Sequence, residues 1–268
     1  MTDPQNTPHS RPASDCGCSN STPTPPKPLS DEKFSLTDFA IGVDVSHHNE
    51  DVNWLKVRAA GYSFAFLKAT EGVTYTDPTF ATNRDRAAAA GFYVGAYHFY
   101  RTSSGAAEQA NHFCDVVGSL RHGELQPVLD IEDETQWKKL TSEQAMKLVM
   151  TWLTTVRNRL GVAPLVYASP SFISDILANA PALRDFGLWL ARYTDASSVD
   201  VPAPWTKWTF WQYTEHGRVD GITTDTDLNR FNGTEAQLAG MVRHAVQLRP
   251  LTTEVYHWWL RMLMRLGL

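Results

Sequence analysis

This 268-residue chain has only three cysteines and no large excess of acidic over basic residues. The three cysteines have no regular spacing, so no disulfide framework is expected. Cys114 falls on the apolar face of a predicted helix and is expected to be a buried free thiol. Cys16 and Cys18 are too few and too isolated for a zinc site. A net charge of −5 and a pI near 6.0 do not indicate the basic patch of a nucleic-acid-binding protein.

Long hydrophobic runs are also missing. The first thirty residues lack the apolar core of a secretory signal peptide, and no stretch is long and apolar enough to cross a membrane. Residues 1–33 are rich in Pro, Ser and Thr and carry too little apolar surface to fold, which predicts a disordered tail. Three interpretations stay open: a signal absent from the chain as written, export by another route, or retention inside the cell.

Short apolar runs alternate with helical patterns across residues 34–248, which predicts one α/β domain. Strands are predicted at 41–46, 63–69, 93–99, 127–132, 164–169, 188–193, 208–213 and 226–231. Helices are predicted at 52–60, 77–90, 104–120, 141–160 and 170–179. Strands alternating with helices indicate a parallel sheet, and eight strands with helices after the first five favour a TIM-like β/α barrel. No glycine-rich phosphate loop follows the first strand, which argues against a nucleotide-binding fold.

The last segment, 249–268, has an apolar stripe at helical spacing with arginines beside it, which predicts an amphipathic helix. Such a helix can pack on the barrel wall, pack on a second subunit, or lie weakly in a membrane interface. We favour packing on protein, because Pro250 allows a clean helix start and nothing further is required of it.

Four carboxylic acids fall at or near the ends of predicted strands: Asp44, Asp130, Glu132 and Asp227. Alternate residues of a strand share a face, as Asp130 and Glu132 would. A parallel barrel gathers the carboxyl ends of its strands at one rim, where barrel enzymes keep their active sites. Ionised carboxylates that converge there repel one another, so at least one pKa should rise. Cleavage of a glycosidic bond needs such a group, protonated, beside a second that is ionised.

Aromatic side chains on the same strands can stack on sugar faces. The candidates are Tyr97, Phe99, Tyr167, Trp189, Tyr193, Trp211 and Tyr213. Alternation along each strand means that some of them must face the helices instead. His47 and His48 are adjacent and would point apart in a strand, so a shared metal site is not expected. Lys68 and Glu71 fit either a surface ion pair or a place in the site.

A series of short segments resembles glycoside hydrolase family 25, the Chalaropsis-type lysozymes. The segments are 42–46 with Trp54, 66–72 with Asp77, Pro78 and Phe80, then 91–99, 127–132, 166–167, 188–193, 211–213 and 227–231. They run in the family's order across about 41–232, and together they are highly specific. The resemblance implies an irregular barrel of five β/α units followed by three further strands. Where many relatives have a Gln-Gly pair after the first strand, this chain has His48, Asn49 and Glu50, which is expected to change a sugar subsite more than the chemistry.

The resemblance implies hydrolysis of the β-1,4 bond between N-acetylmuramic acid and N-acetylglucosamine in peptidoglycan. By motif, Glu132 would be the general acid. Asp130 would stabilise the charged intermediate or position the substrate N-acetyl group. Asp44 and Asp227 would orient and tune that pair. The sugar subsites would be lined by Tyr97, Tyr167, Trp189 and Gln212, with Lys68 close by. No metal and no cofactor is implied.

Two alternatives stay open. A non-catalytic peptidoglycan-binding protein would use the same cleft without cutting. A metal-dependent polysaccharide hydrolase or deacetylase would use Asp44 and Asp130 with His47 or His48. On the favoured interpretation, the partner is the glycan strand of peptidoglycan and no nucleic acid is involved. The protein would then act at the bacterial cell wall, outside the cell or in the periplasm.

Overall fold

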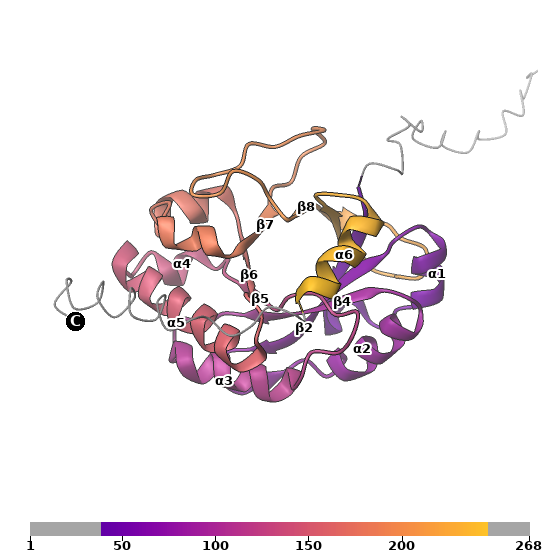
Figure 1. Ribbon diagram of the computed structural model, residues 1–268, viewed down its shortest axis with the longest axis horizontal. Coiled ribbons are helices and arrows are strands. Elements are labelled where there is room, and N and C mark those ends of the chain that lie inside the picture. The colour runs from indigo at the N-terminus through magenta and orange to yellow at the C-terminus, as the bar shows by residue number, and fades with distance from the viewer. Residues whose placement is uncertain (1–38, 246–268) are drawn as a thin grey trace, which may run out of the picture. The chain divides into compact units, whose positions relative to one another are not determined.

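The computed structural model describes residues 39–245, and Figure 1 shows them folded around one closed β-sheet. Eight strands of the described part close the barrel: β1 (Ile41–Val45), β2 (Phe64–Glu71), β4 (Tyr93–Phe99), β5 (Val128–Asp130), β6 (Leu165–Ala168), β7 (Gly187–Ala191), β8 (Phe210–Gly217) and β9 (Thr226–Phe231). Pairing of β1 with both β2 and β9 completes the ring. The eight-stranded barrel predicted from the sequence is confirmed.

The direction of the last strand departs from a fully parallel barrel. Seven strands of the ring run parallel to one another, from β1 through β2, β4, β5, β6 and β7 to β8. The eighth, β9, lies between β8 and β1 and runs antiparallel to both. Asp227 therefore lies near the amino end of its strand, and not near the carboxyl end as predicted. Because β9 is reversed, that amino end meets the same rim as the carboxyl ends of the other strands. A further short strand, β3 (Tyr75–Thr76), pairs with the end of β2 and was not predicted.

Helices cover the outside of the ring, and α2, α3 and α5 lie along its lower edge in Figure 1. The described helices are η1 (His47–Asn49), α1 (Trp54–Ala59), α2 (Phe80–Ala89), α3 (Ala106–Val117), α4 (Glu134–Trp137), α5 (Ser142–Leu160), η2 (Phe172–Ile176), η3 (Pro181–Asp185) and α6 (Glu235–Ala245). The predicted helix at 170–179 is replaced by the π-helical turn η2. α6 and α4 were not predicted.

The longest helix, α5, forms where its sequence pattern requires it. Thr141 accepts a hydrogen bond from the Gln144 amide at 3.2 Å, and the Gln144 side chain accepts one from the Thr141 amide at 2.9 Å. This capping box satisfies two backbone donors at the start of the helix. Gly161 ends the helix in the left-handed conformation, at φ 75°. The apolar face, with Val149 and Trp152 fully buried, packs against the barrel wall.

The apolar core has two parts, one between the barrel and its helices and one inside the barrel. The inner part is rich in aromatic rings, and Phe66 stacks on Trp189 with 4.4 Å between ring centroids. Leu238 and Val242 of α6 belong to this inner cluster. A side chain at Gly95 would lie 2.4 Å from the Phe66 ring, so glycine is what allows the large ring to fit there. The barrel is therefore filled, and the free space lies at its rim.

Some sequence predictions lie outside the described residues. The tail at 1–33 and the amphipathic helix at 249–268 both do. Within residues 39–245, no helix is long and apolar enough to span a membrane. Cys114 is buried on α3 as a free thiol, as expected, and burial raises its pKa to about 11.

Candidate active site

A polar cleft of about 480 Å³ opens at the rim where the carboxyl ends of the parallel strands meet. All four carboxylic acids predicted from the sequence line it: Asp44, Asp130, Glu132 and Asp227. Asp44 comes from β1 and Asp130 from the last position of β5. Asp227 reaches the cleft from the reversed strand β9. The barrel thus brings together acids that lie as much as 183 positions apart in the chain, from 44 to 227.

Asp130 and Glu132 face the cleft from the same segment, but only Asp130 lies in a strand. β5 ends at Asp130, so the predicted strand at 127–132 is shorter than expected. The next residue continues the extended path, because the Ile131 amide donates to the Tyr167 carbonyl at 3.1 Å, and its side chain is buried in the outer core. Glu132 therefore returns to the cleft side and reaches solvent at the mouth.

Asp44 and Asp227 are direct neighbours across β1 and β9. Burial first, and then the charge of Asp44, raise the pKa of Asp227 to about 10. Asp227 is therefore protonated at neutral pH and shares its proton with Asp44 through a side-chain hydrogen bond. Asp44 accepts further hydrogen bonds at Oδ2 from Asn229 at 2.7 Å and from Gln212 at 3.0 Å. Burial raises the pKa of Asp44, and the hydrogen bonds from Asn229, Gln212 and Asp227 oppose that rise.

The pKa of each carboxyl group in the second pair is also raised. Burial and the neighbouring charge of Glu132 raise the pKa of Asp130. Partial burial of its carboxyl group and the charge of Asp44 raise the pKa of Glu132, against the opposing effect of Lys68 and Arg101. Because each charge raises the pKa of a neighbouring acid, the two groups titrate as a unit and not independently. Among the described residues, the buried Oδ1 of Asp130 has no hydrogen-bond partner.

Most of the predicted sugar-binding side chains line this cleft. Those that do are Lys68, Tyr97, Phe99, Tyr167, Trp189, Tyr193 and Gln212. Gln212 Oε1 accepts hydrogen bonds from the hydroxyls of Tyr167 at 2.7 Å and Tyr193 at 2.9 Å, while its amide donates to Asp44. The Gln212 side chain thus links two ring hydroxyls to the carboxylate cluster and fixes their directions.

Two of the predicted aromatic side chains, Trp211 and Tyr213, do not line the cleft, and the structure corrects their predicted place in the sugar site. Tyr213 is partly buried against the outer core. Trp211 is fully buried on the opposite face of β8, among the residues of the outer core. Its indole N–H donates to the Arg192 carbonyl at 2.7 Å, and its ring lies against Arg230. Gln212, the next residue, faces the cleft, because successive side chains of a strand alternate between its two faces.

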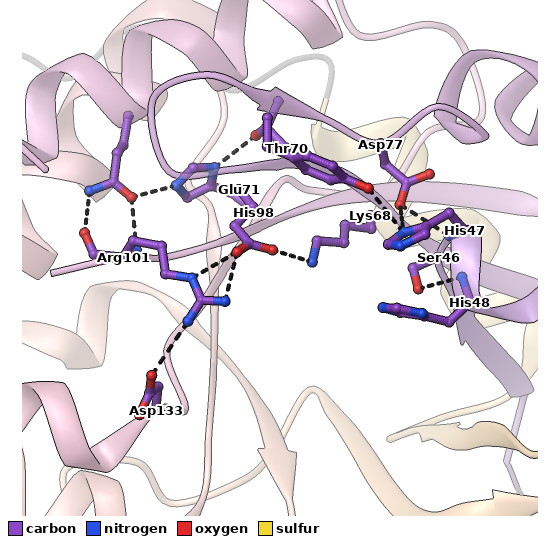
Figure 2. Close-up of polar contacts among 12 residues, drawn as sticks. Ser46, His47, His48, Lys68, Thr70, Glu71, Asp77, His98, Arg101 and Asp133 are labelled. Atoms are coloured by element: carbon purple, nitrogen blue, oxygen red, sulfur yellow. Dashed lines mark hydrogen bonds and ion pairs between the residues drawn. The ribbon is translucent and has the colours of Figure 1, made fainter. Parts of the chain in front are cut away.

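A chain of ion pairs along one wall of the cleft was not predicted as a unit (Figure 2). Glu71 accepts from Lys68 Nζ at 2.6 Å and from Arg101 Nε at 2.7 Å. Arg101 Nη1 also reaches Asp133 at 3.4 Å, directly after Glu132. The Phe99 ring contacts both cations, with its centroid 4.8 Å from Lys68 Nζ and 4.4 Å from the Arg101 guanidinium carbon. Lys68 and Glu71 are therefore residues of the site, one of the two interpretations left open by their spacing.

The two adjacent histidines do not point apart as a strand would require. They lie in the 3₁₀ turn η1, where their rings are in contact, with 3.9 Å between centroids and 39° between the ring planes. His48 lines the cleft, and so do Glu215 of β8 and Asp225 from the segment between β8 and β9. Across the described part of the chain, no group of three or more His, Cys, Asp and Glu side chains is placed to hold a metal ion.

Comparison with known proteins gives a consistent result. Residues 43–222 match the family described as glycosyl hydrolases family 25. The chain is 36% identical over 218 residues to lysozyme M1 of Streptomyces globisporus, covering 78% of this chain and 73% of that protein. It is 32% identical over 184 residues to the N,O-diacetylmuramidase of a Chalaropsis species, covering 64% of this chain and 86% of that protein. The crystal structure of a bacterial lysozyme from Streptomyces coelicolor superposes with a TM-score of 0.73 at 33% identity, over 77% of this chain and 98% of that one.

Proposed function

The chain belongs to the glycosyl hydrolases of family 25, and from this premise we propose that it is a muramidase whose general acid is Glu132. A muramidase hydrolyses the β-1,4 bond between N-acetylmuramic acid and N-acetylglucosamine in peptidoglycan. The observation that carries the residue assignment is the position of Glu132. It lies at the mouth of a cleft that also holds Asp44, Asp130 and Asp227, and its pKa is raised. A carboxyl group that keeps its proton near neutral pH can protonate the leaving oxygen of a glycoside.

Asp130 is the partner of Glu132, and its buried oxygen supports a role in positioning the substrate. Oδ1 of Asp130 has no partner among the described residues, and an unpaired buried acceptor is costly. In our proposal it accepts the N–H of the substrate's 2-acetamido group. The acetamido carbonyl oxygen then bonds to the anomeric carbon as the glycosidic bond breaks, and the leaving oxygen takes the proton of Glu132. The resulting Glu132 carboxylate accepts a proton from the water that attacks the anomeric carbon and releases the acetamido oxygen.

Asp44 and Asp227 act on this pair through charge. Asp44 carries the negative charge of the first pair and raises the pKa of Glu132. Asp227 is protonated, so the pair of Asp44 and Asp227 contributes one negative charge to the cleft and not two. We propose that the two groups tune the protonation of Glu132 and bind hydroxyl groups of the sugar ring.

The test is digestion of purified peptidoglycan by the wild-type protein and by Glu132→Gln, followed by borohydride reduction and mass spectrometry of the fragments. Glu134→Gln is a matched control, because Glu134 lies two residues further on, outside the cleft, where it pairs with Lys138. We expect reducing ends at N-acetylmuramic acid from the wild type and from Glu134→Gln. We expect none from Glu132→Gln, which should still bind glycan.

Other outcomes point to defined alternatives. Reducing ends at N-acetylglucosamine would mean that the protein is a glycosidase that cuts the other β-1,4 bond of the strand. Binding to walls from several sources, with no cleavage by any variant, would favour a wall-binding protein instead. Loss of wild-type cleavage on chelation, restored by zinc, would favour the metal-dependent alternative. Because the substrate is a wall polymer, we propose that the protein acts outside the cytoplasmic membrane.

A further inference from the structure

Three rings form a ledge beside the catalytic cleft, and we call Tyr75, His47 and His48 the aromatic shelf. His48 lines the cleft itself, and its ring lies against that of His47 with 3.9 Å between centroids and 39° between the ring planes. The Tyr75 ring follows at 5.9 Å from His47. Tyr75 is 37% exposed, the His47 side chain is 33% exposed, and His48 is exposed. These rings therefore do not fill the core, which is the usual role of aromatic side chains.

The shelf is held in place by a buried carboxylate. Asp77 Oδ2 accepts hydrogen bonds from the His47 amide at 3.0 Å and from His47 Nδ1 at 2.9 Å, while the Tyr75 hydroxyl lies 3.1 Å from the same ring nitrogen. The Asp77 side chain is fully buried, and Thr79 donates twice to its other oxygen. In Figure 2, His47 lies between Asp77 and His48. A buried charge thus fixes the middle ring of the shelf.

The turn that carries the histidines is tied to both neighbouring segments. Ser46 caps it, accepting from the His48 amide at 3.3 Å, and Asn49 Oδ1 accepts from the Ser46 amide at 3.0 Å. The Asn49 amide group donates to Thr224 Oγ1 and to the Asp225 carbonyl, both at 3.2 Å, in the segment before β9. Exposed side chains usually lose rotamer freedom when a ligand binds. The shelf rings are already held in place, so binding a ligand to them costs less conformational entropy.

The shelf is continuous with the wall of the cleft. Lys68 Nζ lies 5.7 Å from the Tyr75 centroid and 4.8 Å from the Phe99 centroid, and Phe99 lines the cleft. The Lys68 charge is balanced by Glu71 at 2.6 Å, and the Asp77 charge is buried against His47. What the shelf offers a ligand is thus a row of ring faces with little net charge. In the described part of the chain, the His48 ring nitrogens have no hydrogen-bond partner.

We propose that the aromatic shelf is an additional glycan subsite, which binds a neutral N-acetylhexosamine unit of the same strand beyond the two sugars that flank the cut bond. The inference rests on the proposed muramidase function, because it takes the ligand to be the continuation of the substrate. The sugar ring stacks on the shelf, and His48 exchanges a hydrogen bond with a hydroxyl or acetamido group. The enzyme then favours long strands over short ones.

The experiment compares peptidoglycan-derived oligosaccharides of four and of eight or more sugars as substrates. For the wild type we expect a higher kcat/KM on the long chain. Tyr75→Ala, outside the cleft lining, should raise KM on the long chain roughly tenfold and leave the short chain unchanged. His48→Ala, at the cleft itself, should raise KM on the long chain by a larger factor than on the short one. His48→Phe should restore most of the loss, because it keeps a stacking face. His122→Ala, an exposed histidine in the loop before β5, is the matched control and should behave like the wild type.

A binding measurement separates this proposal from the muramidase assignment. In the Glu132→Gln background, calorimetry with the long oligosaccharide should show roughly tenfold weaker binding when His48→Ala is added. Equal affinity, together with an unchanged preference for chain length, would overturn the subsite. A loss of affinity without any cleavage by the wild-type protein would support the subsite and count against the muramidase function instead.

Discussion

Asn229 holds Asp44 in place: its amide donates to Asp44 Oδ2 at 2.7 Å, and its own Oδ1 accepts the Trp189 indole N–H at 2.8 Å. Asn229 is fully buried, so none of these polar groups can turn to water instead. One amide side chain therefore links two residues that line the cleft, the Trp189 ring and the Asp44 carboxyl group.

Removing this amide should destabilise the protein. In Asn229→Leu, the indole N–H and the carboxylate each lose a partner inside the barrel, and we expect the free energy of unfolding to fall by about 1–3 kcal/mol. Denaturant unfolding measures this. Asn158→Leu changes an exposed asparagine on α5 and should shift stability by no more than about 0.5 kcal/mol. Equal stability of the two variants would show that the bridge contributes nothing.

The ion-pair chain on the cleft wall predicts pH shifts of opposite sign. Removing the Arg101 charge with Arg101→Gln should raise the pKa of Glu132, because Arg101 favours its ionised form. Glu71→Gln leaves the charges of Lys68 and Arg101 unbalanced, so the pKa of Glu132 should fall. The high-pH limb of the kcat/KM profile, where the general acid loses its proton, should therefore move up in the first variant and down in the second. Two shifts in the same direction would contradict the charge-balance role of Glu71.

Glu71 itself is expected to contribute stability that depends on pH. Partial burial opposes its ionisation, yet hydrogen bonds and charges from Lys68 and Arg101 hold its pKa below the ordinary value of 4.5. The stabilisation is thus present above that value and is lost as the pH falls through the lowered folded pKa. Glu71→Gln should remove this part of the acid dependence of unfolding, which is measured by denaturant titration across the acid range.

The buried His98 should weaken the fold at acid pH. Burial lowers its pKa to about 3, from an ordinary value of 6.5. Below pH 6.5 the unfolded chain binds a proton that the folded protein refuses until about pH 3, so stability falls with pH by up to about 1.4 kcal/mol per unit. His98→Gln should flatten this slope, whatever it does to the overall stability. The exposed His122→Gln is the control, and equal slopes in all three proteins would refute the assignment.

A buried ion pair on the outer side of the barrel should matter for folding and not for catalysis. Arg84 binds Glu124 through two contacts, of 2.6 and 2.7 Å, and also donates to the Val117 carbonyl. Glu124→Gln leaves the guanidinium without its counter-charge and should cost about 3–5 kcal/mol of stability. Asp85→Asn breaks the exposed pair with Arg121 and should cost less than about 1 kcal/mol. Thermal unfolding and the rate of wall lysis at low temperature distinguish the two effects.

The strands could be predicted because each is a short, mostly apolar run between turn residues. The side of the strand that each residue faces was harder to predict, as Trp211 shows. Both faces of a barrel strand are buried, so hydrophobicity does not say whether Trp211 or Gln212 faces the cleft. The direction of β9 depends on tertiary pairing and leaves no local pattern. The same applies to α6, because its apolar residues pack on the inner core, which forms only once the barrel has closed.

The carboxylate cluster could be predicted because strand ends meet at one rim, whereas its environment could not. Glu71 and Arg101 lie 30 positions apart, and their contact depends on how far β2 and β4 extend before each turns away. The expectation that the two histidines point apart assumes an extended backbone, although both follow the predicted strand at 41–46. A three-residue helical turn rotates successive side chains by far less than a strand, which brings the two rings onto the same side.

Of the four acids, Asp44, Asp130 and Asp227 lie on paired strands, and Glu132 alone lies beyond one. Asp44 and Asp227 are register partners on a hydrogen-bonded ladder, so their spacing changes only if the barrel itself deforms. Glu132 lies beyond the last residue of β5, on a segment held by the side-chain contact of Arg101 with Asp133. A shift of the Glu132 side chain would therefore leave in place the Asp44 group whose charge raises the pKa of Glu132.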